Sequence, residues 1–561
     1  MKKYYILKAC FVLQAFFGVY SSAFAQSDKN IWAWEQIGIP ADFKTLQAKK
    51  EVVIAIVDDA FDLNNSYLKP YFYKNPKEVP GNGIDDDKNG KTDDVMGWDF
   101  SDNDGDVNPP AQHVQRFSHG TKVAGILIQT LQKLCNQTAV FKIIPIKTSS
   151  DARQNNYIID GYTGIDYALD LKADIIITCW SGGLFDIEKE NILKKAQNQG
   201  TLIIGSAGNF YADTPLMPAA FPWVIAVGAT DREMRKYKVS NYGSFVDISA
   251  PSDSIATTFP LQSGFTNYLS ATSASTPIIG GVVAAFMATY PDLKTQDFDR
   301  LLKNTAQPID QYNSLYHGKL GAGLVNVTNL KNYIEHQELP NRFTQTKAYL
   351  PLWQKGTKET SFAVTPVGQY PAYKLLLSQP LMAKNTIDVS LFLNKQKKDT
   401  TLTAAQLSQP YTFRADSFQV HFATKAFKDK NTYLYYEAQP IDSSGLYCRD
   451  KITIKGEEGY IEDGSGAENY ANRCNCKWLI EVPKGKKIKI NFEKFDTEAK
   501  TDQIYFFAED GTEQPILAIF SGPNIPPIIT SWYNKVLIWF VSNESTSAKG
   551  WKLHYQAIDD K

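Results

Sequence analysis

Short, uninterrupted apolar runs alternate with helical patterns from Glu51 to about Asn326. The runs at Val52–Val57, Ile175–Ile177 and Leu202–Ile204 contain no polar residue, as expected of strands that are buried on both faces of a sheet. Helical periodicity separates them, as at Lys122–Lys133. This alternation predicts an α/β domain with a mostly parallel central sheet flanked by helices.

Beyond Glu335 the pattern changes to period-two alternation with frequent turn residues, which predicts two β-sandwich domains, at 342–445 and 446–557. The first 25 residues differ from both parts. They combine a basic start, a short apolar stretch and an A-x-A ending at Ala25, which predicts a cleaved secretory signal at 1–25. The α/β domain is then expected to occupy residues 26–335.

The charge balance narrows the possible partners. Lys plus Arg number 59 and Asp plus Glu number 60, which argues against a chain that neutralises nucleic-acid phosphates. No run after the signal reaches the roughly 18 apolar residues that a membrane span needs. We therefore expect a secreted protein, extracellular or periplasmic, with no nucleic-acid partner and no membrane span. Export permits disulfides, but few cysteines are present to form them.

Four polar residues stand where predicted strands end or predicted helices begin. Asp58 ends the first apolar run, His119 opens a helical pattern, Asn209 follows a later strand, and Ser273 precedes another helix. In parallel sheets, chemistry collects at the carboxyl ends of the strands. The four residue types suit acyl transfer: serine as nucleophile, histidine as base, aspartate as the group that orients the histidine, and asparagine as oxyanion donor.

The segments around these residues resemble the subtilisin-like serine peptidases over roughly residues 30–335. The matching segments, in the family's order, are Val57–Asp62, His119–Gly125, Ser206–Asn209, Thr272–Pro277 and Gly321–Asn326. The resemblance implies a secreted serine endopeptidase that hydrolyses peptide bonds of extracellular proteins. It assigns attack to Ser273, proton transfer to His119, orientation to Asp58 and the oxyanion hole to Asn209.

The resemblance also implies that a protein or peptide substrate pairs as an extended strand. The expected substrate-binding residues are Trp180, Ser181, Gly182, Ser206 and Gly208. We interpret Cys179, beside them, as a small buried residue rather than a reactive thiol.

Several positions depart from the family pattern. Asp59 and Ala60 follow Asp58 where Ser or Thr and then Gly are usual, and Ala271 replaces a Gly before Thr272. Asp59 is a minor alternative to Asp58 as the orienting carboxylate, and its charge is expected to raise a pKa by repulsion. Ala in place of Gly restricts the backbone if the turn needs a positive φ. The alternative hypothesis is a catalytically weak or inactive scaffold that binds an extracellular partner.

Nine aspartates and two lysines lie between Asp85 and Asp106. The first of them have the spacing that opens an oxygen-ligand calcium loop, although the usual Glu at position twelve is absent. The sequence therefore predicts structural Ca²⁺ and no organic cofactor, with a solvated acidic loop as the alternative. The candidate ligands are Asp85, Asp87, Asn89, Asp93 and Asp94.

The last segment, 446–557, resembles a CUB domain, a β-sandwich of extracellular proteins. The matching features include Gly459–Ile461, Cys476-x-Trp478-x-Ile480, Ile488–Glu498 and Gly550–Trp551.

The CUB resemblance implies a Cys448–Cys476 disulfide that leaves Cys474 over. It also implies Ca²⁺ ligands at Glu498, Asp502 and Asn543, of which the last is usually an acid. A stabilising spacer and capture of an extracellular ligand are both open as the role of this domain.

Overall fold

The structure is a computed structural model that describes residues 28–559 with gaps. The signal segment, Cys448 and Asn543 lie outside the described residues. The gaps are 154, 183–186, 314–315, 317, 337–341, 353–358, 367–371, 379–385, 394–395, 408–409, 424–431, 440–450, 464–468, 471–473, 513 and 543–546.

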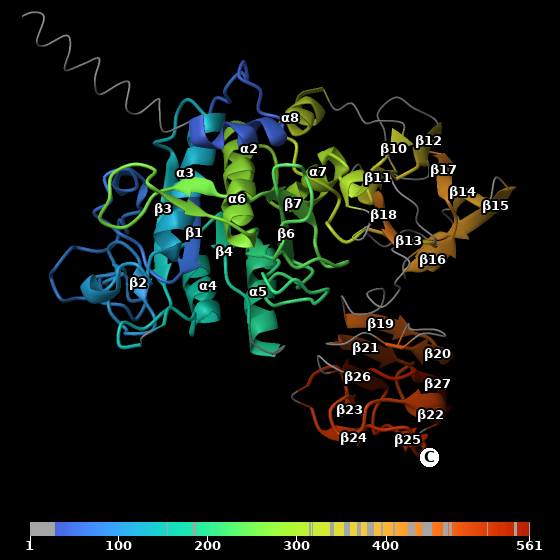
Figure 1. Cartoon of the computed structure of the whole chain (residues 1–561). Coiled ribbons are helices and arrows are strands. Elements are labelled where there is room, and N and C mark those ends of the chain that lie inside the picture. Colours follow the sequence, from blue (N-terminus) through green and yellow to red (C-terminus); the bar gives the residue numbers. More distant parts are fainter. Residues whose placement is uncertain are drawn as a thin grey trace, which may run out of the picture.

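A seven-stranded sheet forms the centre of the N-terminal domain (Figure 1). Its order is β2-β3-β1-β4-β5-β6-β7, and every neighbouring pair is parallel. The three apolar runs named above form β1, β4 and β5, so the predicted parallel α/β architecture is confirmed. The strands are β1 (Val52–Asp58), β2 (Trp98–Asp99), β3 (Phe141–Lys147), β4 (Ile175–Thr178), β5 (Leu202–Ser206), β6 (Val224–Thr230) and β7 (Ile248–Pro251).

Helices cover both faces of this sheet (Figure 1). α3 (His119–Leu134) and α6 (Thr272–Thr289) share one hydrophobic core with the first face, and α4 (Gly161–Asp170) and α5 (Ile187–Gln199) share another with the second. The remaining elements of this domain are α2 (Ile31–Gln36), α7 (Asp297–Thr305), α8 (Val327–His336), the paired strands β8 (Ile255–Thr257) and β9 (Asn267–Leu269), and the 3-10 turns η1 (Asp28–Asn30), η2 (Lys69–Tyr71), η3 (Ala111–His113) and η4 (Asp310–Tyr312).

Helix α6 runs through the middle of the domain, and every one of its residues is buried. Among the described residues it is the one helix long and apolar enough to cross a membrane. Its apolar surface is covered by α3 and the sheet, so its composition reflects a place in the protein core.

Two β-sandwiches follow, as predicted. The first pairs the sheets β10-β12-β17-β14-β15 and β11-β18-β13-β16. Its elements are β10 (Arg342–Phe343), β11 (Lys347–Pro351), β12 (Glu359–Val364), β13 (Ala372–Leu377), β14 (Thr386–Leu393), β15 (Gln396–Thr403), α9 (Ala404–Leu407), β16 (Tyr411–Arg414), β17 (Ser417–Ala423) and β18 (Tyr433–Gln439).

The second sandwich pairs the sheets β19-β21-β26-β23-β24 and β20-β27-β22-β25 around Trp478 and Trp551, whose ring centroids lie 5.0 Å apart. Its strands are β19 (Lys451–Lys455), β20 (Glu458–Glu462), β21 (Asn475–Glu481), β22 (Lys486–Asp496), β23 (Gln503–Ala508), β24 (Ile516–Phe520), β25 (Ile529–Thr530), β26 (Lys535–Val541) and β27 (Gly550–Asp559).

The first sandwich is fastened to the α/β domain through β11. Lys347 is fully buried, and its ammonium group donates to the carbonyl oxygens of Ser244, at 3.0 Å, and Val246, at 2.8 Å. The backbone of Tyr349 exchanges two hydrogen bonds with the side chain of Asn304 in α7, at 2.8 and 2.9 Å. Because these contacts are buried and polar, they fix one orientation between the two parts.

Ala271 directly precedes α6 and has a φ of 65° and a ψ of −165°. Glycine adopts this backbone region readily, whereas a side chain there costs on the order of 1–3 kcal/mol. The family's usual glycine would therefore remove strain at this turn.

We predict that Ala271→Gly raises the free energy of unfolding by about 1 kcal/mol, because relief of strain outweighs the added chain entropy. Denaturant unfolding of the purified protein measures this change. Ala274→Gly is the matched control: Ala274 lies within α6, where glycine is expected to cost about 1 kcal/mol. If both substitutions destabilise the protein equally, the backbone at Ala271 is not strained.

Candidate active site

Asp58 and His119 meet at the carboxyl edge of the sheet. Asp58 is the last residue of β1, and His119 is the first residue of α3. His119 Nδ1 lies 2.8 Å from Asp58 Oδ1 and 3.0 Å from Oδ2. Asp58 is buried, so this carboxylate holds the imidazole in one orientation and leaves Nε2 on the other side of the ring.

Asp59 binds the start of the same helix. Its Oδ1 accepts from the Gly120 N–H at 2.8 Å, and its Oδ2 accepts from the His119 N–H at 3.1 Å. Ser118, the residue before the helix, makes no capping hydrogen bond of its own. Asp59 therefore caps α3 from a distant part of the chain, while Asp58 contacts the imidazole ring.

The adjacent carboxylates of Asp58 and Asp59 shift the pKa values of Asp59 and of His119. Burial, followed by the charge of Asp58, raises the pKa of Asp59 to about 6. Burial alone would lower the pKa of His119, but the charges of Asp58 and Asp59 outweigh it, and the pKa of the imidazole is raised. The repulsion expected from the sequence is present, although burial is the larger cause at Asp59.

Ser273 is the second residue of α6 and is buried. Its Oγ donates to the carbonyl oxygen of Cys179 at 3.4 Å, a long hydrogen bond. Among the described residues, this carbonyl, and not His119, is the acceptor. Cys179 lines the same cavity as Asp58 and His119, so Ser273 contacts a wall of that cavity, although it is not itself one of the lining residues. The Cys179 thiol is buried and its pKa is raised well above the usual range, mainly by desolvation, as expected for a packing residue.

Asn209 contacts the helix that carries Ser273. Its Oδ1 accepts from the backbone N–H of Thr272 at 3.1 Å and from the Thr272 hydroxyl at 2.7 Å. These two bonds fix the amide, with its oxygen toward the start of α6.

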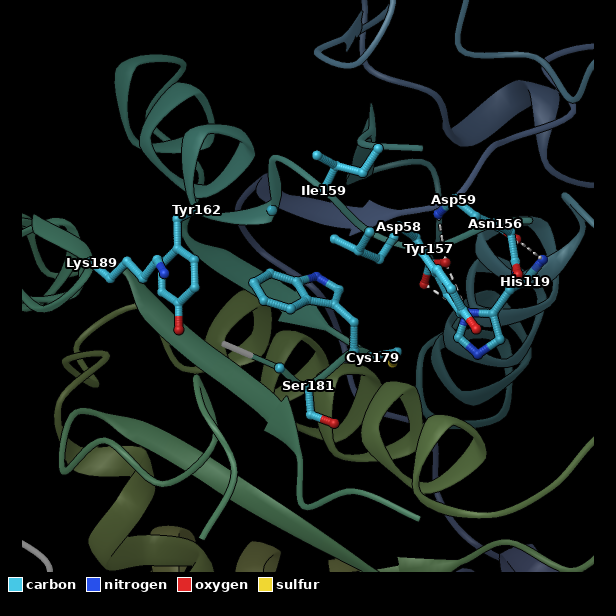
Figure 2. Close-up of a pocket in the computed structure, with 14 residues that line it drawn as sticks. Asp58, Asp59, His119, Asn156, Tyr157, Ile159, Tyr162, Cys179, Ser181 and Lys189 are labelled. Atoms are coloured by element: carbon cyan, nitrogen blue, oxygen red, sulfur yellow. Dashed lines mark hydrogen bonds and ion pairs between the residues drawn. The ribbon is translucent and has the colours of Figure 1, made fainter. Parts of the chain in front are cut away.

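A cavity of about 520 Å³ extends from Asp58 and His119 toward α4 and α5 (Figure 2). Trp180, Ser181 and Gly182, which were expected to bind substrate, line it, whereas Ser206 and Gly208 are not among its lining residues. The other lining residues are Asp59, Asn156, Tyr157, Ile158, Ile159, Gly161, Tyr162, Cys179 and Lys189.

Asn156 is a site residue that sequence reasoning missed. Its Nδ2 donates to Asp59 Oδ2 at 2.9 Å, which ties the cavity wall at 156–159 to the carboxylate that caps α3. Figure 2 shows Asn156 and Tyr157 beside Asp59 and His119. Nothing in the local sequence around Asn156 signals this contact, because its partner lies 97 residues earlier in the chain.

The acidic loop has a different arrangement from the one that its spacing predicts. Asp87 and Asp94 come together with Glu78, which lies before the predicted motif, and these three residues offer oxygens within 4.8 Å of one another. Asp85 instead accepts from backbone N–H groups of Asn89 and Gly90. Asp93 accepts from the backbone of residues 81–83, and the Asn89 amide donates to Asp94.

In the last sandwich, the Tyr470 hydroxyl joins two of the predicted calcium ligands. It donates to Asp502 Oδ2 at 2.5 Å and accepts from the Glu498 N–H at 2.9 Å. The third, Asn543, lies outside the described residues. Cys476 is disulfide-bonded and Cys474 is a thiol, while the expected partner of Cys476, Cys448, is also outside the described residues.

Comparisons with known proteins agree with this fold. Residues 49–343 match the subtilase family, and residues 448–555 match the CUB domain. Subtilisin NAT of Bacillus subtilis subsp. natto is 30% identical over 222 residues, which are 37% of this chain and 55% of that protein. Thermitase of Thermoactinomyces vulgaris is 29% identical over 218 residues, 38% of this chain and 74% of that protein. The chain spans about half the length of the first curated relatives that it matches.

Solved structures align with about half of the chain. Prenylagaramide maturation protease PagA aligns with a TM-score of 0.40 and 21% identity over 52% of this chain and 95% of that one. A cold adapted subtilisin-like serine proteinase aligns with a TM-score of 0.40 and 21% identity over 53% of this chain and 97% of that one. By the match over residues 49–343, the chain belongs to the subtilase family, and it carries a CUB domain near its C-terminal end.

Proposed function

We propose that this chain is a secreted serine endopeptidase that hydrolyses peptide bonds of extracellular proteins. The observation that carries the proposal is the contact between Asp58 and His119 Nδ1, on a cavity that is also lined by Cys179, whose carbonyl oxygen accepts from Ser273 Oγ. Family membership supports the reaction class, and the signal pattern at 1–25 supports export.

In the proposed reaction, Ser273 Oγ attacks the scissile carbonyl carbon, and His119 Nε2 accepts the hydroxyl proton. Asp58 stabilises the imidazolium that forms, without itself taking the proton. The carbonyl oxygen becomes an oxyanion, and Asn209 Nδ2 with the backbone N–H at the start of α6 donates to it. His119 then protonates the leaving amine, and water hydrolyses the acyl-enzyme in the reverse sequence of proton transfers.

Substrate is proposed to enter as an extended peptide along the cavity, past Trp180, Ser181 and Gly182. Ser206 and Gly208 are proposed to bind the peptide on the Asn209 side. The indole of Trp180 is fixed by its Nε1 donating to the Val57 carbonyl oxygen at 3.0 Å, so one wall of the cavity is rigid and aromatic.

No organic cofactor takes part in this mechanism, and structural Ca²⁺ is the proposed ion of the chain. The CUB domain suggests interactions with other proteins, and we propose an extracellular ligand for it. Of the described residues that resemble CUB calcium ligands, Asp502 accepts from the Tyr470 hydroxyl through its carboxylate, whereas Glu498 contacts Tyr470 through its backbone N–H.

A fluorophosphonate tests the nucleophile directly. We expect the mature protein to be labelled and Ser273→Ala to be unlabelled, with kcat reduced on the order of 10⁶-fold. Ser275→Ala is the matched control, because Ser275 lies in the same helix but donates to the Ala250 carbonyl oxygen at 2.8 Å. Folded wild-type protein that does not label would favour the inactive binding scaffold.

Asn209→Ala tests the oxyanion hole. Loss of one donor to the oxyanion is expected to lower kcat by about 100- to 1000-fold and to leave KM nearly unchanged, because the donor acts in the transition state. Steady-state kinetics on a chromogenic peptide separates the two constants. A rise in KM with an unchanged kcat would place Asn209 in substrate binding instead.

Asp59→Asn tests the electrostatic part of the site. The Asp59 charge stabilises the imidazolium and raises the pKa of His119, so its removal lowers that pKa and leaves more neutral base at low pH. The acid limb of kcat/KM is therefore expected to move to lower pH, by up to about one unit. Asp170→Asn, at the exposed end of α4, removes the same charge far from the imidazole and should leave the limb in place.

A further inference from the structure

We propose that a divalent cation, with Ca²⁺ favoured by the ligand chemistry, binds between Glu78, Asp87 and Asp94. In this assignment Glu78, from the segment before the acidic loop, supplies the carboxylate that the loop motif lacks at its last position. The ion would connect this segment, the loop and α4. Its binding can be measured without reference to catalysis.

The three carboxylates converge in a buried place. Each offers an oxygen within 4.8 Å of the others, and Glu78 and Asp94 are only 6% and 0% exposed. Three negative groups this close repel one another unless a proton or a cation neutralises them. The donors are all oxygen, which is the ligand type that Ca²⁺ prefers, and neither histidine nor cysteine belongs to the group.

Glu78 provides the second observation that points to a ligand. Its Oε1 accepts from the Asp87 N–H at 3.1 Å, but its Oε2 is buried and has no hydrogen-bond partner among the described residues. A buried carboxylate oxygen without a partner is costly and uncommon in native proteins. A cation held jointly with Asp87 and Asp94 would satisfy it.

In a neighbouring acidic cluster, a lysine side chain neutralises the converging carboxylates. Asp99, Asp102 and Asp151 also converge, but the buried Lys147 ammonium lies 2.8 Å from Asp99 and 2.5 Å from Asp151. That cluster already contains its cation. Across the described part of the chain, no lysine or arginine forms an ion pair with the Glu78 group.

The surroundings of the group hold its carboxylates in place. Asn75 Nδ2 donates to Asp94 Oδ1 at 3.0 Å and to Asp87 Oδ2 at 3.3 Å. Asn89 Nδ2 donates to Asp94 Oδ2 at 2.8 Å, and the Tyr167 hydroxyl donates to the same oxygen at 2.6 Å. Outer contacts of this kind orient metal ligands.

Tyr167 also connects the group to the cavity. It lies in α4, whose first residues, Gly161 and Tyr162, line the cavity described above. An ion on Asp94 would therefore stabilise the helix that forms one wall of the proposed substrate cavity.

Chelator-treated full-length protein is titrated with Ca²⁺ by calorimetry and with Tb³⁺, whose luminescence is excited through nearby aromatic rings. All variants carry Glu498→Gln, which removes a candidate ligand of the CUB domain. We expect one Ca²⁺ per chain, at least about tenfold weaker binding in Glu78→Gln, and binding within about twofold of the parent in Asp86→Asn. Asp86 is an exposed carboxylate of the same loop, so Asp86→Asn removes the same charge as Glu78→Gln without removing a proposed ligand.

Circular dichroism shows whether each variant is folded, and fluorophosphonate labelling separately reports the proposed peptidase activity. If Glu78→Gln does not fold, Asp87→Asn replaces it, with the same expected loss of affinity. The proposal is overturned if the parent binds neither ion, or if folded Glu78→Gln or Asp87→Asn binds Ca²⁺ as tightly as the parent. A parent that binds the ion but is not labelled would sustain this site while rejecting the proposed peptidase activity.

Discussion

The site depends on two consecutive carboxylates that hold one histidine by different groups. Asp58 contacts the imidazole, and Asp59 accepts from the backbone of His119 and Gly120. Asp58 ends β1 and Asp59 follows it, so both positions are fixed by an interior strand that is paired with β3 on one side and β4 on the other. The start of α3 is thereby tied to the sheet edge, and through Asn156 one wall of the cavity is tied to the same point.

Local patterns were sufficient to predict the parallel sheet, and two of the four polar residues that they singled out, Asp58 and His119, meet at its edge. Strands buried on both faces have a distinctive composition, and a parallel sheet brings their carboxyl ends to one edge regardless of the conformations of the loops. The contacts of Asn156 and Glu78 were not predictable, because each depends on the path of a loop. Asp85 and Asp93 have the spacing of metal ligands, but the loop's own N–H groups compete for their oxygens.

The departures from the family pattern have distinct physical meanings. Asp59 replaces a small polar residue and gains a structural role as the cap of α3. Ala271 replaces a glycine and keeps the backbone conformation that glycine would allow, with φ at 65°. The buried carboxylate of Asp59 is stabilised by four hydrogen bonds. For the positive φ of Ala271, no compensating contact is found among the described residues.

Lys347 has a consequence for how the chain can be divided. A lysine in an alternating strand is expected to face solvent, yet this one is buried against carbonyl groups of the α/β domain. Removal of the sandwich would leave those carbonyl oxygens without their cationic donor and would expose them on the α/β domain. Exchange of this sandwich between homologues would therefore require the carbonyl pocket to move with it.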